Sequence, residues 1–352
     1  MTPSPQPVFA AIGLCCPIGT TFHDTISSYA QKARGFTKAN QLVGSDGSAP
    51  TLACCFPFVP GQSYFERLYQ LFGSALNDCL SQAPSLSTSW TKTFELHVLL
   101  PAWMHKAETG DFIRDLLPPG IERLTRLVTY YGEEAHSLVL INLAAQMVRS
   151  GEKDVIFIAG LDSYINPNIL DHLDARGVMF TRDNAYGFIP GEGCGVILIT
   201  SQKLCPKPLG SIVGFGSGHE PVAPAADAAP IRGRGLASAL QGVAHAAGPR
   251  EMPRRVLTDQ NGERWRAEQY GFAVSSVGQM LGDAVLDPEC HCLTLGHLGS
   301  ATGTVMVGLA LGRPPDEQEP TETLASILTI ATNASGYSCA LMLRGGQRWS
   351  IP

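Results

Sequence analysis

The stretch "YYGEEAHSLVLINLAAQMVRSGEKDVIFIAG", residues 130–160, places a helix directly before a strand. Apolar residues recur at helical spacing through residues 134–150. The continuous apolar run at 154–161 is typical of a strand that is buried on both faces. The stretch therefore predicts a helix packed on a buried sheet. It also raises the question of why this helix begins with two acids, Glu133 and Glu134.

The same two kinds of element recur along the chain. Strands are predicted at 8–14, 95–100, 195–200, 210–217, 254–259 and 290–295, and two more within 324–344. Helices are predicted at 64–82, 119–130, 235–248, 264–281 and 301–312. This alternation indicates an α/β fold with helices against mixed sheets. The order of elements suggests two similar halves, 1–207 and 208–352, within one integrated globular unit.

Composition narrows the class of protein. The chain has 352 residues, of which 44% are hydrophobic and only 16% charged, which suits a large core and argues against a coiled coil or a disordered scaffold. A net charge of -6 without a basic stripe makes nucleic acid an unexpected partner. The first residues lack the features of a signal peptide, and no apolar run is long enough to span a bilayer. We therefore expect a cytoplasmic protein with no membrane partner.

Ten cysteines are expected to be reduced thiols in that compartment. The adjacent pairs Cys15–Cys16 and Cys54–Cys55 would point to opposite faces of strands, as small buried residues do. The nearest approach to a metal motif is "CHC" at 290–292, with His297 nearby, but its spacing matches no usual zinc pattern. No metal and no cofactor are expected.

Four ordered segments carry a resemblance to a known family. They are "SGEKDVIFIAGLDSYINP" (150–167), "YGFIPGEGCGVILIT" (186–200), "LGHLGSATGTVMVGLAL" (295–311) and "TNASGYSCALML" (332–343). Together they resemble the β-ketoacyl synthase branch of the thiolase-like superfamily. The resemblance implies a thiolase-like fold, with two similar α/β halves and mixed sheets in a five-layer αβαβα arrangement. It also implies a dimer, formed through the strand segment around 154–161.

The resemblance locates a degenerate active site. Family enzymes carry a cysteine at the N-terminus of a buried helix, where the helix dipole lowers the thiol pKa. Here Glu134 takes that place, and a carboxylate cannot form the thioester that condensation requires. Asp259, in "LTDQNGERW", matches the first family histidine, and His297 is the second histidine, retained. The expected neighbours of this pocket are Glu133, His136, Asn333 and Tyr337.

Ordinary structural roles compete with these assignments. Acids complement the dipole at any helix N-terminus, so Glu134 needs no further role. Asp259 lies in strong turn chemistry and would brace its own turn, and His297 would be a structural residue under a glycine-rich turn. Alternatively, Glu134 mimics a bound acyl group. A relocated nucleophile at Cys194 or Cys339 is disfavoured. Cys194 occupies a position where the family has a small residue, so it is expected to be a packing residue. Cys339 could act only as a base for an active-site cysteine, and that cysteine is replaced by Glu134.

These features predict a non-catalytic protein that forms a heterodimer with a related thiolase-like chain. Chain-length-factor subunits, which lost the cysteine and pair with an active ketosynthase, are one precedent, and they would bring an acyl carrier protein as partner. The segment "TDQNGERWRAEQYGFA" (258–273) is more similar to degenerate thiolase-like proteins encoded in pairs in bacterial type VI secretion clusters. Those proteins are thought to assist loading of a secreted effector, as an adaptor or co-chaperone.

Two further hypotheses stay open. The first is an acyl-thioester decarboxylase or hydrolase, in which Glu134 is the base and His297 donates to an oxyanion. The second is passive binding of an acyl-pantetheine ligand in a tunnel, which the short stretch between 101 and 130 makes doubtful.

Overall fold

The computed structural model describes residues 4–59, 61–83, 94–104, 117, 124–224, 230–312 and 325–346. The longer strands are β1 (Pro7–Cys15), β4 (Phe94–Pro101), β5 (Leu124–Gly132), β6 (Val155–Ser163), β7 (Glu192–Ser201), β8 (Gly210–His219), β9 (Pro253–Thr258), β11 (Ser326–Thr332) and β12 (Tyr337–Gly345). The short strands are β2 (Phe36–Lys38), β3 (Thr51–Ala53) and β10 (Glu289–Cys290). The helices are α1 (Phe22–Ala30), α2 (Tyr64–Gln82), α4 (Glu134–Arg149), α5 (Pro167–Ala175), α6 (Arg234–Ala247), α7 (Arg264–Val277), α8 (Cys292–Leu295) and α9 (Thr302–Gly312).

Ten strands form one continuous sheet in the order β10-β9-β11-β12-β8-β1-β7-β6-β4-β5. β9 and β11 are parallel, as are β4, β5 and β6, whereas β1, β7, β8 and β12 pair antiparallel with their neighbours. The predicted mixed α/β class is therefore confirmed. Only two residue pairs, Val8↔Ser211 and Phe9↔Gly210, join β1 to β8, so the sheet consists of two strand groups connected by a narrow seam.

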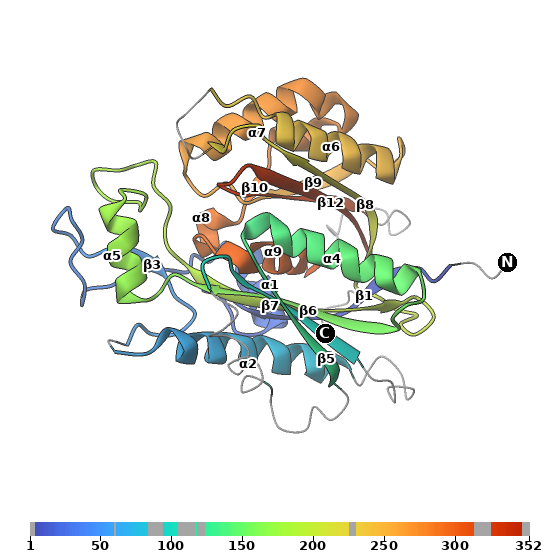
Figure 1. The fold of residues 1–352 in the computed structure, drawn as a ribbon, viewed down its shortest axis with the longest axis horizontal. Coiled ribbons are helices and arrows are strands. Elements are labelled where there is room, and N and C mark those ends of the chain that lie inside the picture. Colours follow the sequence, from blue (N-terminus) through green and yellow to red (C-terminus); the bar gives the residue numbers. More distant parts are fainter. Residues whose placement is uncertain are drawn as a thin grey trace.

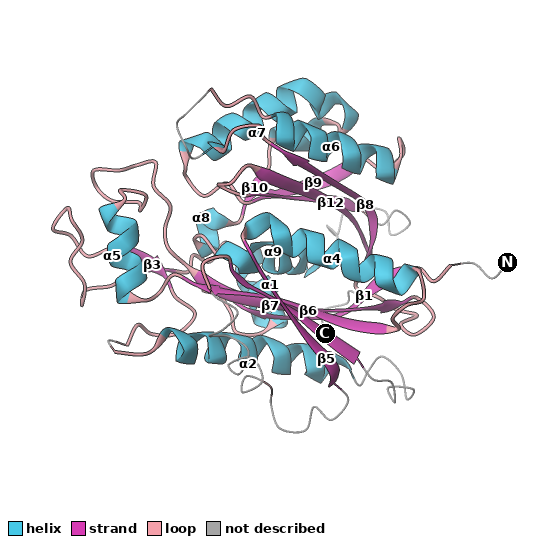
Figure 2. Ribbon diagram, viewed as in Figure 1, coloured by secondary structure: helices cyan, strands magenta, loops and turns pink. Residues whose placement is uncertain are grey.

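The helices divide the molecule into layers that Figures 1 and 2 display. Helices α6 and α7 cover the outer face of the β8–β12 group, and α2 covers the outer face of the group that contains β1, β6 and β7. Helices α4 and α9 lie between the two groups and contact strands of both. The expected alternation of helix and strand layers is present. Internal similarity between residues 1–207 and 208–352 stays a prediction.

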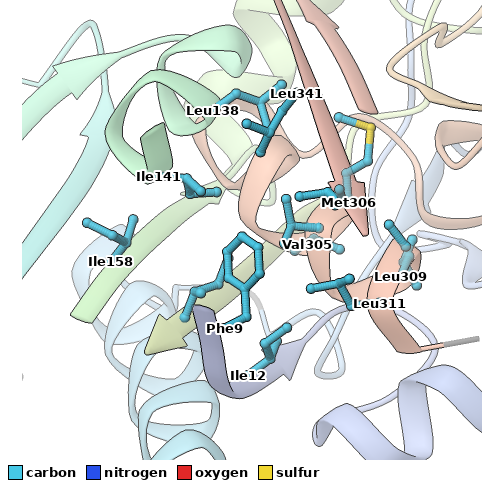
Figure 3. Close-up of a cluster of buried hydrophobic side chains, with 14 of the residues drawn as sticks. Phe9, Ile12, Leu138, Ile141, Ile158, Val305, Met306, Leu309, Leu311 and Leu341 are labelled. Carbon is cyan, nitrogen blue, oxygen red and sulfur yellow. The ribbon is translucent and has the colours of Figure 1, made fainter. Parts of the chain in front are cut away.

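The central layer contains the largest apolar cluster (Figure 3). Helix α9 is buried at every residue, which explains why its sequence is apolar all round instead of amphipathic. Side chains from α4 and α9 meet residues of β1, β6 and β12 there, and those labelled in the figure include Phe9, Ile12, Leu138, Ile141, Ile158, Val305, Met306 and Leu341. Because α4 is enclosed in this way, its N-terminus is held at a defined place inside the molecule.

Two predicted elements were wrong. Residues 124–132 form strand β5 where a helix was expected at 119–130, and residues 119–123 lie outside the described residues. Thr, Val and Tyr side chains favour a strand there, and hydrogen bonding to β4 fixes the segment in the strand conformation. The strand expected at 290–295 is confined to Glu289–Cys290, and Cys292–Leu295 form a helical turn, because β10 pairs with β9 at only two positions.

The strand that was expected to pair with a second chain does not lie at an edge of the sheet. The segment around 154–161 forms β6, which lies between β7 and β4, and all its residues are buried. Its backbone groups are already bonded to both neighbours, so it cannot pair with a second chain. The outermost strand on this side of the sheet is β5, and its residues are mostly half-buried.

Close packing of α2 on β1 depends on Gly13, where an added Cβ would lie 1.9 Å from the backbone oxygen of Ala75. We expect Gly13→Ala to lower the free energy of unfolding by about 1–3 kcal/mol, because neither backbone can move freely. Urea denaturation measures this. Gly73→Ala in α2, where no atom lies within 4 Å of an added Cβ, is the matched control and should raise stability by about 0.5–1 kcal/mol. Equal effects of the two variants would contradict the close approach.

Candidate functional site

The N-terminus of α4 forms the centre of the candidate site. The Ala135 amide donates to Asn333 Oδ1 at 2.8 Å, and the Glu133 amide donates to His136 Nδ1 at 3.0 Å. The Tyr337 ring stacks on the His136 ring, with 5.5 Å between the ring centroids. Side chains from the β11–β12 turn therefore hold the first turn of the helix in place. This contact leaves Glu134, the first helical residue, pointing toward α7.

Glu134 is buried, with 5% of its surface exposed, and one of its carboxylate oxygens has two partners. Its Oε1 accepts a hydrogen bond from Arg266 Nη2 at 2.9 Å and lies 3.0 Å from His297 Nε2. Burial raises the pKa of Glu134, but the Arg266 charge and the bond from His297 outweigh burial and lower it to about 2. Glu134 is therefore ionised over the whole physiological pH range and is a weak base.

Arg266, in the first turn of α7, bridges the carboxylates at the site. Its Nη1 donates to Asp259 Oδ2 at 2.6 Å, and its Nε donates to Glu263 Oε2 at 3.1 Å. Its guanidinium also lies 4.4 Å from the Trp265 ring centroid. A single guanidinium thus neutralises part of the charge on three carboxylates, which is the pairing that buried ions require.

Asp259 is part of this ion cluster and does not brace a local turn. Besides Arg266, its Oδ2 accepts a hydrogen bond from the Thr332 amide at 2.6 Å. Burial raises the pKa of Asp259 to about 6, against the lowering effect of Arg266. The bond to Thr332 connects the end of β9 with the end of β11.

His297 uses both ring nitrogens within the cluster. Asn261 Nδ2, which can only donate, lies 3.3 Å from His297 Nδ1, so Nδ1 acts as the acceptor. The proton is then on Nε2 and is donated to Glu134. The Phe188 ring packs against the imidazole with 4.7 Å between centroids, and the Tyr164 ring does so at 5.2 Å. The imidazole is therefore fixed in place and has no free donor.

A pocket of about 980 Å³ opens above this cluster. Its described lining includes the carboxylates Glu133, Glu134, Asp162 and Glu263 and the aromatic side chains Trp103, Tyr164, Tyr186, Phe188 and Trp265. Arg266 and His297 line it too, whereas Asp259 lies behind them. The structure thus brings Glu134, Asp259 and His297 together. Of the expected neighbours, Glu133 lines the pocket, whereas His136, Asn333 and Tyr337 support the helix from behind.

None of the ten cysteines is among the described residues that line the pocket. Cys194 and Cys339 are fully buried, and burial raises the pKa of both thiols, that of Cys339 to about 12. In the "CHC" segment His291 bonds to the Thr258 carbonyl and Cys292 to the Asp259 carbonyl, so these side chains have backbone partners. Within the described part of the chain, no group of three or more His, Cys, Asp or Glu side chains could hold a metal ion.

Sequence reasoning missed Arg266, Glu263, Asn261 and Asp162. Only one signal pointed to the first of these. Two carboxylates that are buried close together require a nearby cation. The helix that begins with "ERWRAEQ", a few residues after Asp259, contains two arginines that could supply it. Which of its two arginines turns inward depends on how α7 packs. Asp162 gave no signal, since it ends an apolar strand and has no charged neighbour in the sequence.

Comparisons with known proteins agree with this architecture. Residues 128–204, which contain β6, β7 and α4, match the family model of the β-ketoacyl synthase N-terminal domain. No curated protein matches the chain. The structure describes no helix that is both long enough and apolar enough to cross a membrane.

The chain has a mixed α/β ketosynthase-like fold. One similar solved structure is a chain of the AntDE:AntF complex, a type II PKS acyl-carrier protein in complex with its ketosynthase bound to the hexaketide. Its TM-score is 0.73 at 14% sequence identity, and the match covers 97% of this chain and 99% of that chain. The ishigamide ketosynthase/chain length factor gives a TM-score of 0.72 at 16% identity and the same coverage. The ketosynthase from module 6 of the bacillaene synthase of Bacillus subtilis 168 gives 0.71 at 14% identity, over 97% of this chain and 72% of that one.

The ion cluster makes a stability prediction. Arg266→Met should lower the free energy of unfolding by about 3–5 kcal/mol at neutral pH, because it leaves buried carboxylates without a cation. Urea denaturation measures the change. Arg264→Met is the matched control, since Arg264 lies on the same helical turn but is 76% exposed and pairs with Glu268 in solvent, which predicts about 0.5 kcal/mol or less. Comparable losses for both variants would show that the cluster is not a stabilising unit.

Asp162 makes a pH prediction. Burial raises the pKa of Asp162 from 3.8 to about 7. The folded chain therefore holds a proton that the unfolded chain releases, and this contribution to stability is lost as the pH rises from about 4 to about 7. Asp162→Asn should flatten the fall in stability between about pH 5 and about pH 7.5 by about 1 kcal/mol or more. Asp171→Asn, a change on exposed α5, should keep the wild-type pH profile, and identical profiles for Asp162→Asn and wild type would refute the assignment.

Proposed function

We propose that this protein is a non-catalytic, ketosynthase-like subunit that acts in the cytoplasm as the partner of a related thiolase-like chain. The observation that carries the proposal is the ion cluster at the N-terminus of α4. Where a nucleophile would be needed, Glu134 is held by Arg266 and His297. A carboxylate in two strong bonds cannot attack a thioester and form the acyl intermediate that condensation requires.

Replacement of the nucleophile by another residue is not supported. No described residue that lines the pocket is a cysteine. Ser300 lines it, but its hydroxyl donates to the Leu161 carbonyl at 2.7 Å, and no histidine activates it. Hydrolysis or decarboxylation through Glu134 and His297 is disfavoured for a related reason. The pKa of Glu134 is too low for a base, and His297 would have to leave Glu134 before it could donate to an oxyanion.

The edge of the sheet supports a partner chain. β5 pairs with β4 on one side, and no described strand covers its other side. Its side chains from Leu127 to Tyr131 are half-buried, although β5 is the outermost strand. An uncovered edge with this composition is suited to pairing with another strand. We infer that a related chain covers β5, where the sequence had suggested the strand at 154–161.

Two kinds of complex fit this arrangement. The ishigamide structure is a ketosynthase/chain length factor, and by analogy this chain would accompany an active ketosynthase and its acyl carrier protein. The segment at 258–273 instead favours the paired thiolase-like proteins of type VI secretion clusters, with a secreted effector as cargo. In this segment Asp259, Glu263 and Arg266 form the ion cluster, so its distinctive residues stabilise the site and give it no catalytic group. We favour the adaptor or co-chaperone role on this ground.

The test is the native mass of tagged protein purified from its own host, with each co-purifying chain identified. We expect a one-to-one complex with a second thiolase-like chain, which Val128→Lys on β5 should disrupt because a charge on an edge strand opposes pairing. An attached effector would support the adaptor role, and a partner with an intact Cys-His-His set would support the chain-length-factor role. A homodimer that carries a bound acyl species, or acyl-thioester turnover that Glu134→Gln abolishes, would reject the proposal.

A further inference from the structure

The solvent side of α4 is more apolar than an uncovered helix surface needs to be. Val139, Leu143 and Met147 follow one another at intervals of four residues, which places them in one row along the helix. Leu143 is 37% exposed, and the other two side chains are half-buried. The opposite side of α4 is packed into the central layer, so apolar residues occupy most of the circumference of the helix. A helix of this kind is expected to be covered on both sides, as α9 is.

The row adjoins the outer edge of β5. Helix α4 contacts both β4 and β5, and Figure 1 shows no element in front of it. Val139, Met147 and Tyr130 of β5 all pack against the margin of the same central cluster. The Tyr130 hydroxyl lies 3.2 Å from His97 Nδ1, and the two rings are stacked, so the Tyr130 side chain is held in place. The strand edge and the helix row therefore form one continuous surface.

The charges on this surface are of one sign. Arg126 on β5 and Arg149 in the last turn of α4 are exposed, and neither forms an ion pair with a described residue. The acids of the same two elements are engaged, because Glu133 accepts a hydrogen bond from the β11–β12 turn and Glu134 belongs to the ion cluster. Charges of both signs occur only in the turn at 151–154. A partner that presents carboxylates to the two arginines would gain ion pairs, whereas a second copy would present arginines from the same elements.

The connection between β5 and α4 indicates what kind of chain can cover both. β5 ends at Gly132 and α4 begins at Glu134, so the helix follows the edge strand directly. A chain of the same fold that adds its own edge strand to β5 carries its own following helix beside α4, when matching faces of the two sheets join. A single strand from an unrelated protein would cover the edge of β5 and leave Leu143 in solvent.

We propose that the row of Val139, Leu143 and Met147 is a second half of the partner interface, which packs against an apolar helix of a related thiolase-like chain that also presents carboxylates to Arg126 and Arg149. Rows of side chains spaced by four residues pack into the grooves of a facing helix, which is the contact required. The inference rests on the proposed function, since it specifies the partner of that proposal. It adds that strand pairing alone is insufficient and that a second copy of this chain is disfavoured.

The test is the recovery of the partner chain with tagged protein purified from its own host. We expect Leu143→Glu to reduce the partner recovered per tagged chain by at least about tenfold, because the new carboxylate would be buried between two helices without a cation. Leu286→Glu is the matched control, since Leu286 is 72% exposed and lies outside this surface, and it should keep recovery within about twofold of wild type. Urea denaturation checks that both variants fold, and the milder Leu143→Gln replaces Leu143→Glu if the latter unfolds more readily than wild type.

Charge reversal tests the chemistry of the partner. The double variant Arg126→Glu/Arg149→Glu should reduce recovery by about fivefold or more at low salt, and it should remove the salt dependence of the wild-type complex. Arg250→Glu, an exposed change in the loop after α6, should have no such effect. Equal recovery with the double variant and with wild type would overturn the acidic character of the partner, as would an equal loss with Arg250→Glu.

The outcomes separate the two proposals. Loss of the partner with Val128→Lys on β5 but not with Leu143→Glu would reject this inference alone, because strand pairing would then suffice. Absence of a second chain from the wild-type preparation, or a homodimer in its place, would reject the proposed heterodimer together with this inference. Loss of the partner with both variants, and retention with Leu286→Glu, is the expected result.

Discussion

The neutralisation of buried carboxylates by Arg266 is the interaction on which the candidate site depends. Glu134 comes from α4, whereas Asp259 and Glu263 come from the loop between β9 and α7, and each would be costly to bury alone. One guanidinium satisfies them because its five donors spread in a fixed plane, so it can bond in several directions at once. A lysine could not serve the three carboxylates in this way. The charged groups of the cluster are therefore bonded to one another.

The layered architecture brings these residues together. Helix α4 contributes Glu134, the loop after β9 contributes Asp259, and the turn before α9 contributes His297. The central layer of α4 and α9 is enclosed by strands on both sides, so it fixes the distances between these three segments to within hydrogen-bond range. A rigid scaffold of this kind also explains why the site can hold a buried ion cluster. Packing supplies the free energy that desolvation of the charges costs.

Two features of the fold, the outer edge of β5 and the pocket, lie close to each other. Among the described strands, none covers the outer edge of β5, and the pocket opens over the N-terminus of α4. The ends of β5 and α4 connect them, since Gly132 and Glu133 both line the pocket. A partner on β5 would therefore lie one short segment away from whatever the pocket contains.

The sequence by itself determined most of the fold. Apolar runs bounded by glycine located β1, β4, β6, β7 and β8 within a residue or a few, and helical spacing located α2, α4 and α6. These elements are predictable because burial on both faces of a strand, or on one side of a helix, leaves a local periodicity. The conformations predicted for residues 124–132 and 290–295 were wrong, since pairing with β4 and β9 decides them, and pairing is not local.

For the site, the resemblance located Glu134, Asp259 and His297 but not the contacts among them. Only the tertiary structure decided that Arg266 faces inward while Arg264 faces solvent. The sequence records which charges exist, whereas the balance of charge inside a protein depends on which of them folding brings within a few ångströms of each other. That is why the sequence could locate Glu134 at the start of a helix, and could not locate the ion cluster around it.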